Sequence, residues 1–520
     1  MNDPTLPPLP GQHVLVLGLG ESGLAMARWC VRNGAQVSVW DSRQSPPQLA
    51  ALREQVPAAE VRGGALDADA LHGVQVLLKS PGLGPHDPRI VAALQAARAG
   101  HVPVAGELDL FVQALAALRA ERDYAPQLLA VTGTNGKTTT TALTALLVER
   151  AGRSVVAAGN IGPTMLDTLM RVLDDGALPQ VWVLELSSFQ LDGVQGFGPN
   201  AAAVLNLTQD HLDWHGDMVA YAAAKARIFG PRTVAVINRD DPQVEAMVAA
   251  PAAPPATTRG KPRAAKALPR AVVRFGLDVP TAPGDYGLIT EGGIAWLVRA
   301  LPPEGEGHRR RKDDAPAEIH LQRLMPADAL RLRGRHNAAN ALAALALATA
   351  IDCPLAPMLH GLREYGGEPH RVQPVGGVGD VEAFDDSKGT NVGATVAALV
   401  GLGADKSPSR LIVILGGDGK GQDFAPLAEP VTHHARAVAL IGRDAGAIEQ
   451  ALARTGVTMQ HHADLAAAVR WCFEQARPGD AVLLSPACAS LDMFRNYGHR
   501  AEVFVQAVHE LAAERGEIQT

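Results

Sequence analysis

Short apolar runs that end in glycine-rich or polar turns recur along this chain, and segments with helical spacing follow them. The first run, residues 13–17, leads through a glycine turn into an alanine-rich segment that extends to about residue 32. A short apolar run bounded by turn residues predicts a buried strand, whereas apolar positions three and four apart predict a helix. Because strands that alternate with helices are typical of parallel sheets, the sequence predicts an α/β fold.

The same criteria predict further elements throughout the chain. Strands are expected at residues 36–40, 128–131, 154–158, 181–186, 202–207, 234–237, 382–384, 411–415 and 481–484. Helices are expected at residues 107–118, after the turn at 133–136, and from about residue 332 to residue 350. The polar residues 119–126 and the glycine-rich turn at 366–371 indicate domain boundaries.

The run at residues 128–131 is followed by a turn at 133–136 and by Lys137 and Thr138, a strand, turn and helix arrangement. It predicts a phosphate loop, since glycines let backbone N–H groups approach phosphate oxygens and the helix N-terminus adds donors. Lys137 would reach the β and γ phosphates of ATP, and the Thr138 hydroxyl would hold Mg²⁺. Val131 stands where the longer motif has glycine, so a glycine turn beside a solvated lysine is the structural alternative.

Near the N-terminus, Gly18, Gly20 and Gly23 form a G-x-G-x-x-G motif between a strand and a helix. Asp41 ends the next strand, 18 positions beyond Gly23, close to where dinucleotide-binding folds place a ribose-binding acid. The domain is therefore expected to be Rossmann-like, but the motif does not select a nucleotide, and NAD is only one candidate. The turn that Asp41 opens and the turn at residues 79–83 are either ligand contacts or ordinary turns.

Polar residues in the central part of the chain suggest chemistry. Glu185 ends a buried run, which suits a carboxylate beside magnesium, although a strand-end carboxylate in solvent is the alternative. His211 lies among acids after a strand, where α/β enzymes concentrate their chemistry. Lys225 shares a helical face with Tyr221 and Phe229, and this spacing alone favours a lysine that snorkels to solvent.

The last part of the chain contains two turns in which glycine stands beside lysine. Residues 385–391 open a helix, and residues 416–421 follow a strand, so both turns suit anions. Cys488 follows the last expected strand. Without a base nearby in the sequence, it is expected to be a small packed residue and not a nucleophile.

Composition narrows the class of protein. A chain of 520 residues is expected to form about two to four domains, and a net charge of −7 with 4% aromatic residues gives no reason to expect nucleic acid. The scattered cysteines argue against zinc and disulfides, and neither a secretory signal nor a membrane span is present, so a cytoplasmic location is expected. Residues 251–270 and 302–317 lack an apolar period and are expected to be surface insertions.

The motifs, taken in this order, resemble the Mur ligases of peptidoglycan synthesis over almost the whole chain. The segments that carry the resemblance are L-G-L-G-E-S-G, T-G-T-N-G-K-T-T, G-N-I-G, E-L-S-S-F-Q-L, D-H-L-D, A-A-K-A-R-I, G-R-H-N, P-H-R, D-S-K-G-T-N, G-G-D-G-K and L-S-P-A-C-A-S. The resemblance implies a UDP-substrate-binding Rossmann-like domain at 1–115, a central P-loop ATPase domain at 116–367 that holds the two insertions, and a Rossmann-like amino-acid-binding domain at 368–520.

The resemblance also implies an ATP-dependent ligase. ATP would convert the carboxylate of UDP-N-acetylmuramoyl-L-alanine to an acyl phosphate, and the amine of D-glutamate would attack it, with release of ADP and phosphate. The implied cofactors are ATP, two Mg²⁺ ions and a carbamate on Lys225. The implied partners are these small molecules alone, and the chain is expected to be a monomer. D-glutamate rests on the resemblance, since residue spacing cannot distinguish it from another acidic amino acid.

The resemblance assigns site residues by motif. The catalytic residues would be Lys137, His211 and Lys225, and the metal ligands would be Thr138, Glu185, His211 and Lys225. The ATP contacts would be Gly133, Thr134, Asn135, Gly136, Lys137, Thr138, Thr139, Thr140, Asn340, Arg371 and Asp386. The UDP-substrate contacts would be Gly18, Gly20, Ser22, Gly23, Asp41, Ser42, Arg43, Ser80, Pro81, Gly82 and Asn160. The D-glutamate contacts would be Lys388, Thr390, Lys420, Ser490 and Leu491. The sequence departs modestly from the family pattern at Glu368, Asp385 and Tyr497.

Other functions stay open on the sequence. A folylpolyglutamate synthetase-like ligase would share the phosphate loop and the lysine carbamate, although the glycine-motif domain before that loop argues against it. An NAD-binding oxidoreductase with an incidental ATP site is a second alternative. A non-catalytic nucleotide-gated binding protein is a third.

Overall fold

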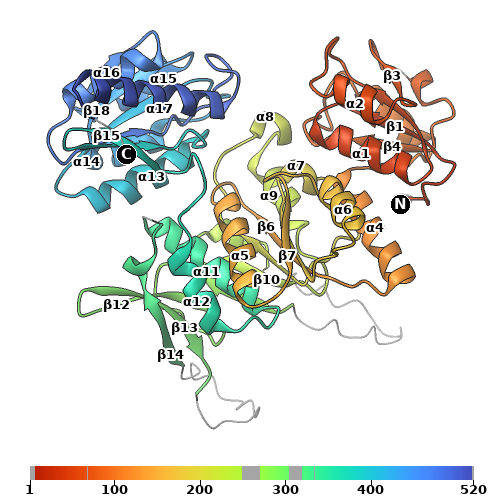
Figure 1. Cartoon of the computed structure of the whole chain (residues 1–520), viewed down its shortest axis with the longest axis horizontal. Helices are drawn as coiled ribbons and strands as arrows, with labels where there is room; N and C mark the ends of the chain where they lie inside the picture. The colour runs from red at the N-terminus through yellow and green to blue at the C-terminus, as the bar shows by residue number, and fades with distance from the viewer. Residues whose placement is uncertain (1–5, 67, 249–269, 304–318, 333, 518–520) are drawn as a thin grey trace, which may run out of the picture.

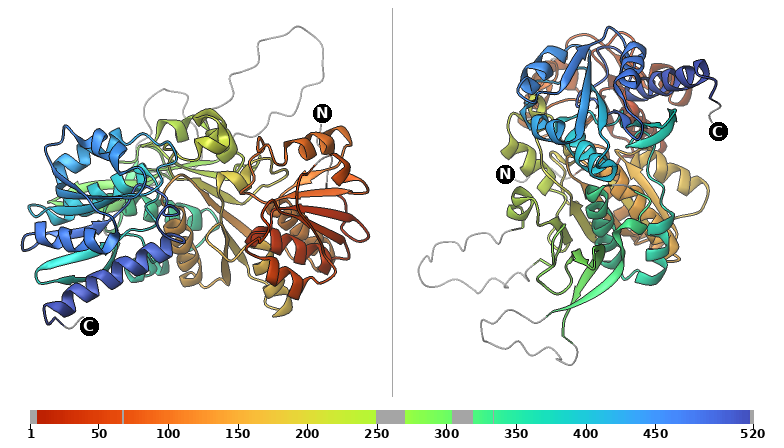
Figure 2. Two further views of the ribbon diagram at one scale, coloured as in Figure 1. Left: turned by 90° about the horizontal axis from the view of Figure 1, so that it is seen from above. Right: turned by 90° about the vertical axis from the view of Figure 1, so that its left-hand side faces the viewer.

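The computed structural model describes residues 6–66, 68–248, 270–303, 319–332 and 334–517. These residues form three α/β units, each built on its own sheet, and the N-terminal and C-terminal units lie on opposite sides of the central one (Figure 1 and Figure 2). The predicted fold class is confirmed. The insertions expected near 251–270 and 302–317 lie outside the described residues, except for residues 270, 302 and 303.

The N-terminal unit contains a five-stranded parallel sheet in the order β3-β2-β1-β4-β5. Its strands are β1 His13–Leu17, β2 Gln36–Trp40, β3 Glu60–Arg62, β4 Val76–Lys79 and β5 Val104–Ala105. Its helices are α1 Glu21–Arg32, α2 Leu49–Gln55 and α3 Val91–Ala99, with a 3₁₀ turn η1 Ala68–Leu71. The strand order reverses between β1 and β4, which is the place where open α/β sheets bind ligands.

The central unit contains a nine-stranded sheet in the order β14-β13-β12-β11-β10-β9-β6-β8-β7. The strands are β6 Gln127–Thr132, β7 Val155–Gly159, β8 Val181–Glu185, β9 Ala201–Val204, β10 Val234–Asn238, β11 Val272–Phe275, β12 Tyr286–Glu291, β13 Ile294–Leu301 and β14 His320–Pro326. The last two pairings, β12 with β13 and β13 with β14, are antiparallel. The helices are α4 Glu107–Arg122, α5 Lys137–Arg150, α6 Met165–Asp174, α7 Ser188–Leu191, α8 Leu212–His215, α9 Met218–Ala226, α10 Pro242–Ala246, α11 Arg335–Thr349 and α12 Leu355–Glu364, with η2 Ala327–Ala329.

The C-terminal unit contains a six-stranded sheet in the order β15-β16-β20-β17-β18-β19, in which β15 alone is antiparallel among the described strands. The strands are β15 Gln373–Val378, β16 Val381–Asp385, β17 Leu411–Gly416, β18 Ala435–Ile441, β19 Thr458–His461 and β20 Ala481–Leu484. The helices are α13 Val392–Lys406, α14 Ala428–His434, α15 Ala445–Leu452, α16 Leu465–Gln475 and α17 Tyr497–Glu514, with η3 Ala425–Leu427.

Several elements differ from their predicted ranges by one to four residues, and two of these differences affect a loop or a boundary. The strand expected at 202–207 ends at Val204, because beyond it the backbone carbonyl of Asn206 accepts the N–H of Thr134 and the N–H of Leu207 binds the Asp241 carboxylate. The helix expected at 107–118 continues to Arg122. The domain boundary expected between residues 115 and 116 therefore falls inside α4.

Apolar packing joins the N-terminal unit to the central one. Helix α4 packs on the central sheet, where Phe111 lies edge-on to Trp182 of β8 with ring centroids 4.9 Å apart. A single core cluster includes residues of β1 and α1 together with residues of β8 and α6.

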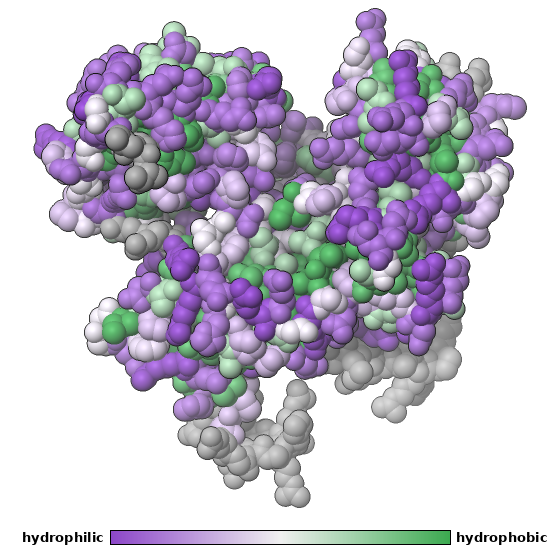
Figure 3. Space-filling model, in the orientation of Figure 1, coloured by the Kyte–Doolittle hydropathy of each residue, from purple (hydrophilic) through white to green (hydrophobic). Residues whose placement is uncertain are grey.

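On the face drawn in Figure 3, hydrophilic residues cover most of the surface and apolar residues show mainly in its hollow centre. No helix in the described part of the chain is both long and apolar enough to cross a membrane.

Glu107, the first residue of α4, is buried at this junction of the two units. Its Oε1 atom accepts the backbone N–H of Leu166 at 3.0 Å. Nearby, Arg28 of α1 forms an ion pair with Asp167 of α6 at 2.7 Å. Burial raises the pKa of Glu107 to about 7, although the Leu166 N–H and the Ser22 hydroxyl oppose this shift.

We expect Glu107→Gln to gain thermal stability relative to the natural protein as the pH rises. Below about pH 4.5 the carboxyl group is protonated in both the folded and the unfolded chain, whereas between about pH 4.5 and 7 it must take up a proton on folding. The natural protein therefore loses stability relative to Glu107→Gln as the pH rises. This loss levels off above pH 7 at about 3 kcal/mol. Melting temperatures of both proteins across this pH range test it, and a pH-independent difference would contradict it.

Candidate active site

The phosphate loop follows β6 and is held in a fixed shape. Gly136 has a φ of +83°, a left-handed conformation that favours glycine, and it caps the N-terminus of α5. The Lys137 ammonium donates to the carbonyl oxygens of Gly133 at 3.0 Å and Thr134 at 2.8 Å. The alternative of a simply solvated lysine is therefore wrong. Burial lowers the pKa of Lys137, and the nearby negative charge of Glu185 opposes this.

Glu185 ends β8, which lies beside β6 in the sheet, and its side chain is 1% exposed. Its Oε1 atom accepts the amide of Asn160 at 2.7 Å, while Oε2 has no hydrogen-bond partner among the described residues. The alternative of a carboxylate in open solvent is therefore wrong. An unpaired buried carboxylate oxygen suits a hard cation such as Mg²⁺, so Glu185 and the Thr138 hydroxyl fit this ion.

Lys225 of α9 is 1% exposed, so the snorkelling lysine that spacing favours is wrong. Its ammonium donates to the Gly133 carbonyl at 2.8 Å and lies 4.7 Å from the ring centroid of Tyr221. Burial and the positive charge of Lys137 lower its pKa well below the usual value. Phe229 lies beyond the end of α9, which is Ala226.

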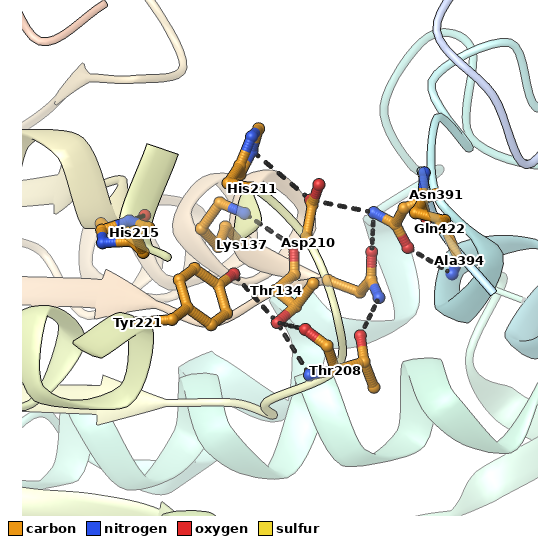
Figure 4. Close-up of polar contacts among 12 residues, drawn as sticks. Thr134, Lys137, Thr208, Asp210, His211, His215, Tyr221, Asn391, Ala394 and Gln422 are labelled. Atoms are coloured by element: carbon orange, nitrogen blue, oxygen red, sulfur yellow. Dashed lines mark hydrogen bonds and ion pairs between the residues drawn. The ribbon is translucent and has the colours of Figure 1, made fainter. Parts of the chain in front are cut away.

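His211 precedes α8, and Figure 4 shows its ring above Lys137 and joined to Asp210 by a dashed line. Its Nε2 atom lies 3.4 Å from an oxygen of Asp210. Burial lowers the pKa of His211, the negative charge of Asp210 raises it, and the charges of Lys420, Lys137 and Lys225 lower it further. Within the described residues, no three His, Cys, Asp or Glu side chains cluster as metal ligands.

The C-terminal unit contacts the phosphate loop directly. Arg371 donates to the Thr138 hydroxyl at 2.6 Å, and the Asn391 amide donates to the Asn135 side chain at 3.1 Å. Asn391 also lies 3.4 Å from Asp210 (Figure 4). Two of the expected ATP contacts, Thr138 and Arg371, are therefore side by side although they are far apart in the sequence.

Of the expected ATP contacts outside the phosphate loop, Asn340 touches the loop, and Asp386 is buried in the C-terminal unit. Asn340 of α11 packs against Gly136, since a Cβ atom at that glycine would lie 2.6 Å from the Asn340 Oδ1 atom. Asp386 is buried and accepts the Ser485 hydroxyl at 2.7 Å. Burial raises the pKa of Asp386 to about 7, and Ser485 and Arg371 oppose this shift.

The expected D-glutamate contacts lie on loops of the C-terminal sheet. The Lys388 ammonium lies 5.2 Å from the ring centroid of Tyr497, and the Thr390 N–H binds the Lys388 carbonyl. Ser490 is buried, but Leu491 is 72% exposed. Lys420 is on a separate, exposed turn.

Arg500 of α17 links two of these loops and was missed from the sequence. Its buried guanidinium donates to the carbonyl oxygens of Ser387 at 2.7 Å and Cys488 at 3.1 Å. The Ser387 carbonyl is one residue before Lys388, and the Cys488 carbonyl is two residues before Ser490. The sequence did contain a signal for its burial. Arg500 stands four residues before Phe504 and so shares the apolar face of the helix with it.

A cavity of about 510 Å³ opens beside β1 and β4 of the N-terminal unit. It brings together the expected substrate residues Gly18, Gly20, Ser22, Asp41, Ser42, Arg43, Ser80, Pro81 and Gly82. Gly23 is not among the lining residues, but a Cβ atom there would lie 2.0 Å from the Gly18 carbonyl, so glycine allows α1 to pack on the loop. Asn160 does not line this cavity, and its side-chain amide donates to Glu185.

Side chains beside the cavity are held by ion pairs. Asp41 accepts the Leu19 N–H at 2.8 Å and the Arg43 side chain at 2.7 and 2.8 Å. Burial alone raises the pKa of Asp41, but these donors outweigh it and lower the pKa to about 2. Arg89, which was missed from the sequence, lines the cavity and donates to the Ser42 hydroxyl at 3.1 Å.

Three family models match separate parts of the chain. The model described as Mur ligase MurD-like, N-terminal domain, matches residues 12–105. The Mur ligase middle domain matches residues 131–275, and the model described as Mur ligase, glutamate ligase domain, matches residues 370–488. The matches follow the order of the three units.

Curated relatives match over nearly the full length. A protein of Albidiferax ferrireducens named UDP-N-acetylmuramoylalanine--D-glutamate ligase is 59% identical over 510 residues, which cover 98% of this chain and 98% of that relative. A Burkholderia mallei protein of the same name is 58% identical and covers 97% of this chain and 98% of its own length.

Solved structures share the fold at low sequence identity. MurF from Acinetobacter baumannii has a TM-score of 0.56 and 18% identity, covering 96% of this chain and 91% of its own. MurF ligase from Thermotoga maritima in complex with ADP has a TM-score of 0.54 and 16% identity, covering 97% and 96%. These likenesses concern the fold alone. With three matching domain models and full-length relatives above half identity, the chain belongs to the Mur ligase family.

Proposed function

We propose that this chain is an ATP-dependent ligase that joins D-glutamate to UDP-N-acetylmuramoyl-L-alanine in peptidoglycan precursor synthesis. The observation that carries the reaction class is the meeting of the phosphate loop, the buried Glu185 and Arg371 of the C-terminal unit at one place. The choice of substrates is supported by relatives of that name at 58–59% identity. These relatives do not favour the oxidoreductase, the folylpolyglutamate synthetase-like ligase or a non-catalytic protein.

The proposed reaction has two steps. A carboxylate oxygen of the UDP-linked substrate attacks the γ phosphorus of ATP, the bond from that phosphorus to the bridging oxygen breaks, and ADP leaves. The D-glutamate nitrogen then attacks the carbonyl carbon, the carbon–oxygen bond to phosphate breaks, and phosphate and a proton are released. Lys137 binds the transferred phosphoryl group as a cation, and Arg371, which donates to the Thr138 hydroxyl, neutralises further charge there.

We infer that Thr138 and Glu185 hold one Mg²⁺ ion, and that His211 and Lys225 hold a second. Bound Mg²⁺ neutralises charge on the phosphates. A lysine can become an anionic ligand if its neutral amine adds CO₂, forming a nitrogen–carbon bond and releasing a proton. The lowered pKa of Lys225 favours the neutral amine that this carbamate requires.

The remaining assignments are also proposals. The N-terminal cavity would take the UDP-substrate, and its arginines, Arg43 and Arg89, suit the pyrophosphate. Lys388 and Lys420 would bind the two carboxylates of D-glutamate. The domain division at residues 115 and 367 and the monomeric state rest on the family resemblance, and the cytoplasmic location rests on the four unpaired cysteines.

ADP release is expected only when the UDP-linked substrate and D-glutamate are both present. We expect the amino-acid substrate to carry a second carboxylate, because Lys388 and Lys420 offer two cations. L-alanine and glycine should therefore not support turnover. A panel of amino acids in a phosphate-release assay tests this. Release without any amino acid, or equal rates for neutral amino acids, would contradict the proposed substrate.

Lys225→Ala is expected to lose nearly all ligase activity, by about a hundredfold or more, because an anionic ligand near the phosphates disappears. Added bicarbonate should not restore it, since no amine remains to be modified. Initial rates with and without bicarbonate measure this effect. Unchanged turnover would remove Lys225 from the mechanism.

Gly136→Ala is expected to weaken ATP binding by about tenfold or more, because the new methyl group meets Asn340 at a residue with φ +83°. Gly152→Ala is the matched control. Its φ is +84°, but nothing lies within 4 Å of the added atom, so it carries the backbone strain without the collision. Equilibrium binding of a non-hydrolysable ATP analogue compares them. Equal affinities of the two variants would contradict the assignment of this turn.

A further inference from the structure

Helix α8, which carries His211 at its N-terminal end, has little to hold it in place. It comprises only Leu212–His215 and contains no buried residue. Ring contacts replace a core: the Trp214 ring lies 4.8 Å from Phe189 and 4.4 Å from His215, measured between centroids. Phe189 in turn lies 4.6 Å from His211. Phe189 thus lies between His211 and Trp214 and contacts both rings.

Trp214 is fixed from the N-terminal unit. The Lys79 ammonium lies 5.3 Å from the centroid of the Trp214 ring, a distance at which a cation is attracted to an aromatic face. A Cβ atom placed on Gly84 would lie 3.4 Å from the indole, so backbone also packs against this ring. The indole Nε1 atom is buried without a hydrogen-bond partner among the described residues. The Cδ1 and Nε1 edge of the indole therefore packs against Gly84, while Lys79 approaches the ring itself.

The same lysine shapes the N-terminal cavity. Lys79 ends β4, and its ammonium donates to the Leu83 carbonyl at 2.7 Å, which closes the turn at residues 80–83. All four residues of this turn line the 510 Å³ cavity. Burial lowers the pKa of Lys79 to about 8, with Asp192 opposing, so both ends of this contact are partly shielded from water.

A second row of rings leads from Trp214 to Lys225. His215 lies 5.2 Å from Tyr221, and the Lys225 ammonium lies 4.7 Å from the Tyr221 centroid. The His215 Nε2 atom is also 2.9 Å from the Ser188 hydroxyl, which ties α8 to α7. Contacts from Trp214 thus reach both residues proposed to hold the second metal ion.

We propose that the contact of Lys79 and Gly84 with Trp214 couples the N-terminal cavity to the metal-ligand histidine, with Trp214 as a positioning residue. A ligand that fills the cavity fixes the turn at 80–83, and Lys79 and Trp214 then hold α8 with His211 in place. By linkage, ordering at His211 strengthens binding in the cavity to the same extent. The inference rests on the proposed function, because it takes His211 as a metal ligand.

Hydrogen–deuterium exchange tests the coupling without catalysis. In the natural protein, UDP-N-acetylmuramoyl-L-alanine without ATP is expected to slow exchange at residues 211–216. Lys79→Met and Trp214→Ala are expected to lose this protection while still showing protection around the cavity. Trp214→Phe should keep it, since a phenyl ring retains a face for the cation. Protection at 211–216 that is unchanged in Lys79→Met and Trp214→Ala would overturn the proposal.

Kinetics give the second readout. Trp214→Ala is expected to lower kcat about tenfold with a smaller change in the KM for ATP, and Trp214→Phe to remain within about threefold of the natural protein. Adding Lys79→Met to Trp214→Ala should cause little further loss of kcat, because the effect of Lys79 on His211 runs through its contact with Trp214. Additive losses would overturn the coupling.

Matched controls separate this result from folding and from the proposed function. The Arg323 guanidinium lies 5.9 Å from the ring centroid of Trp296 in β13, which makes the same kind of cation and ring pair near a distant edge of the central sheet. Trp296→Ala should therefore leave kcat and the exchange at residues 211–216 unchanged. If Trp214→Ala fails to fold, Lys79→Met and Trp214→Phe still decide the question. Absence of D-glutamate-dependent ADP release by the natural protein would refute the proposed function, whereas the exchange experiment with UDP as a probe would still report the coupling.

Discussion

The structure depends on titratable groups that are gathered at the carboxyl edge of the central sheet. Glu185 and Lys225 are buried there beside the half-buried Lys137, and a buried charge without a partner is costly. Parallel pairing of β6 with β8 sets Val131 opposite Glu185, so the strand ends bring loop and carboxylate together without any local sequence signal. Such an edge is stable only with opposite charges close by, which makes it a natural place for phosphates and magnesium.

The site is complete only where the units meet. The central unit supplies the phosphate loop and Glu185, the C-terminal unit reaches it through Arg371 and Asn391, and the N-terminal unit contributes a separate cavity. Packing of α4 on β8 makes the first two units share one core, so the cavity is held at a defined position relative to the loop. This arrangement suits a reaction that brings a nucleotide-linked acid to ATP.

Apolar runs and turn residues in the sequence correctly predicted elements whose structure depends on neighbouring residues alone. Residues 13–17, 36–40 and 481–484 are apolar runs bounded by turns, and they form strands with those bounds. The burial of Lys225 could not be predicted from its helix, because the carbonyl that binds its ammonium belongs to Gly133 in a distant loop. Arg500 was missed for the same reason, since its partners belong to other loops, and Arg89 binds Asp87 nearby but reaches the cavity through Ser42, 47 residues away.

Transfer of the terminal phosphoryl group of ATP to the substrate carboxylate is the central claim, and oxygen isotopes test it most directly. UDP-N-acetylmuramoyl-L-alanine labelled with ¹⁸O in its free carboxylate is turned over with ATP and D-glutamate, and the phosphate is analysed by mass spectrometry. The account predicts one ¹⁸O atom in each phosphate released, because the carboxylate oxygen leaves with phosphorus. Phosphate without the label would contradict an acyl-phosphate intermediate.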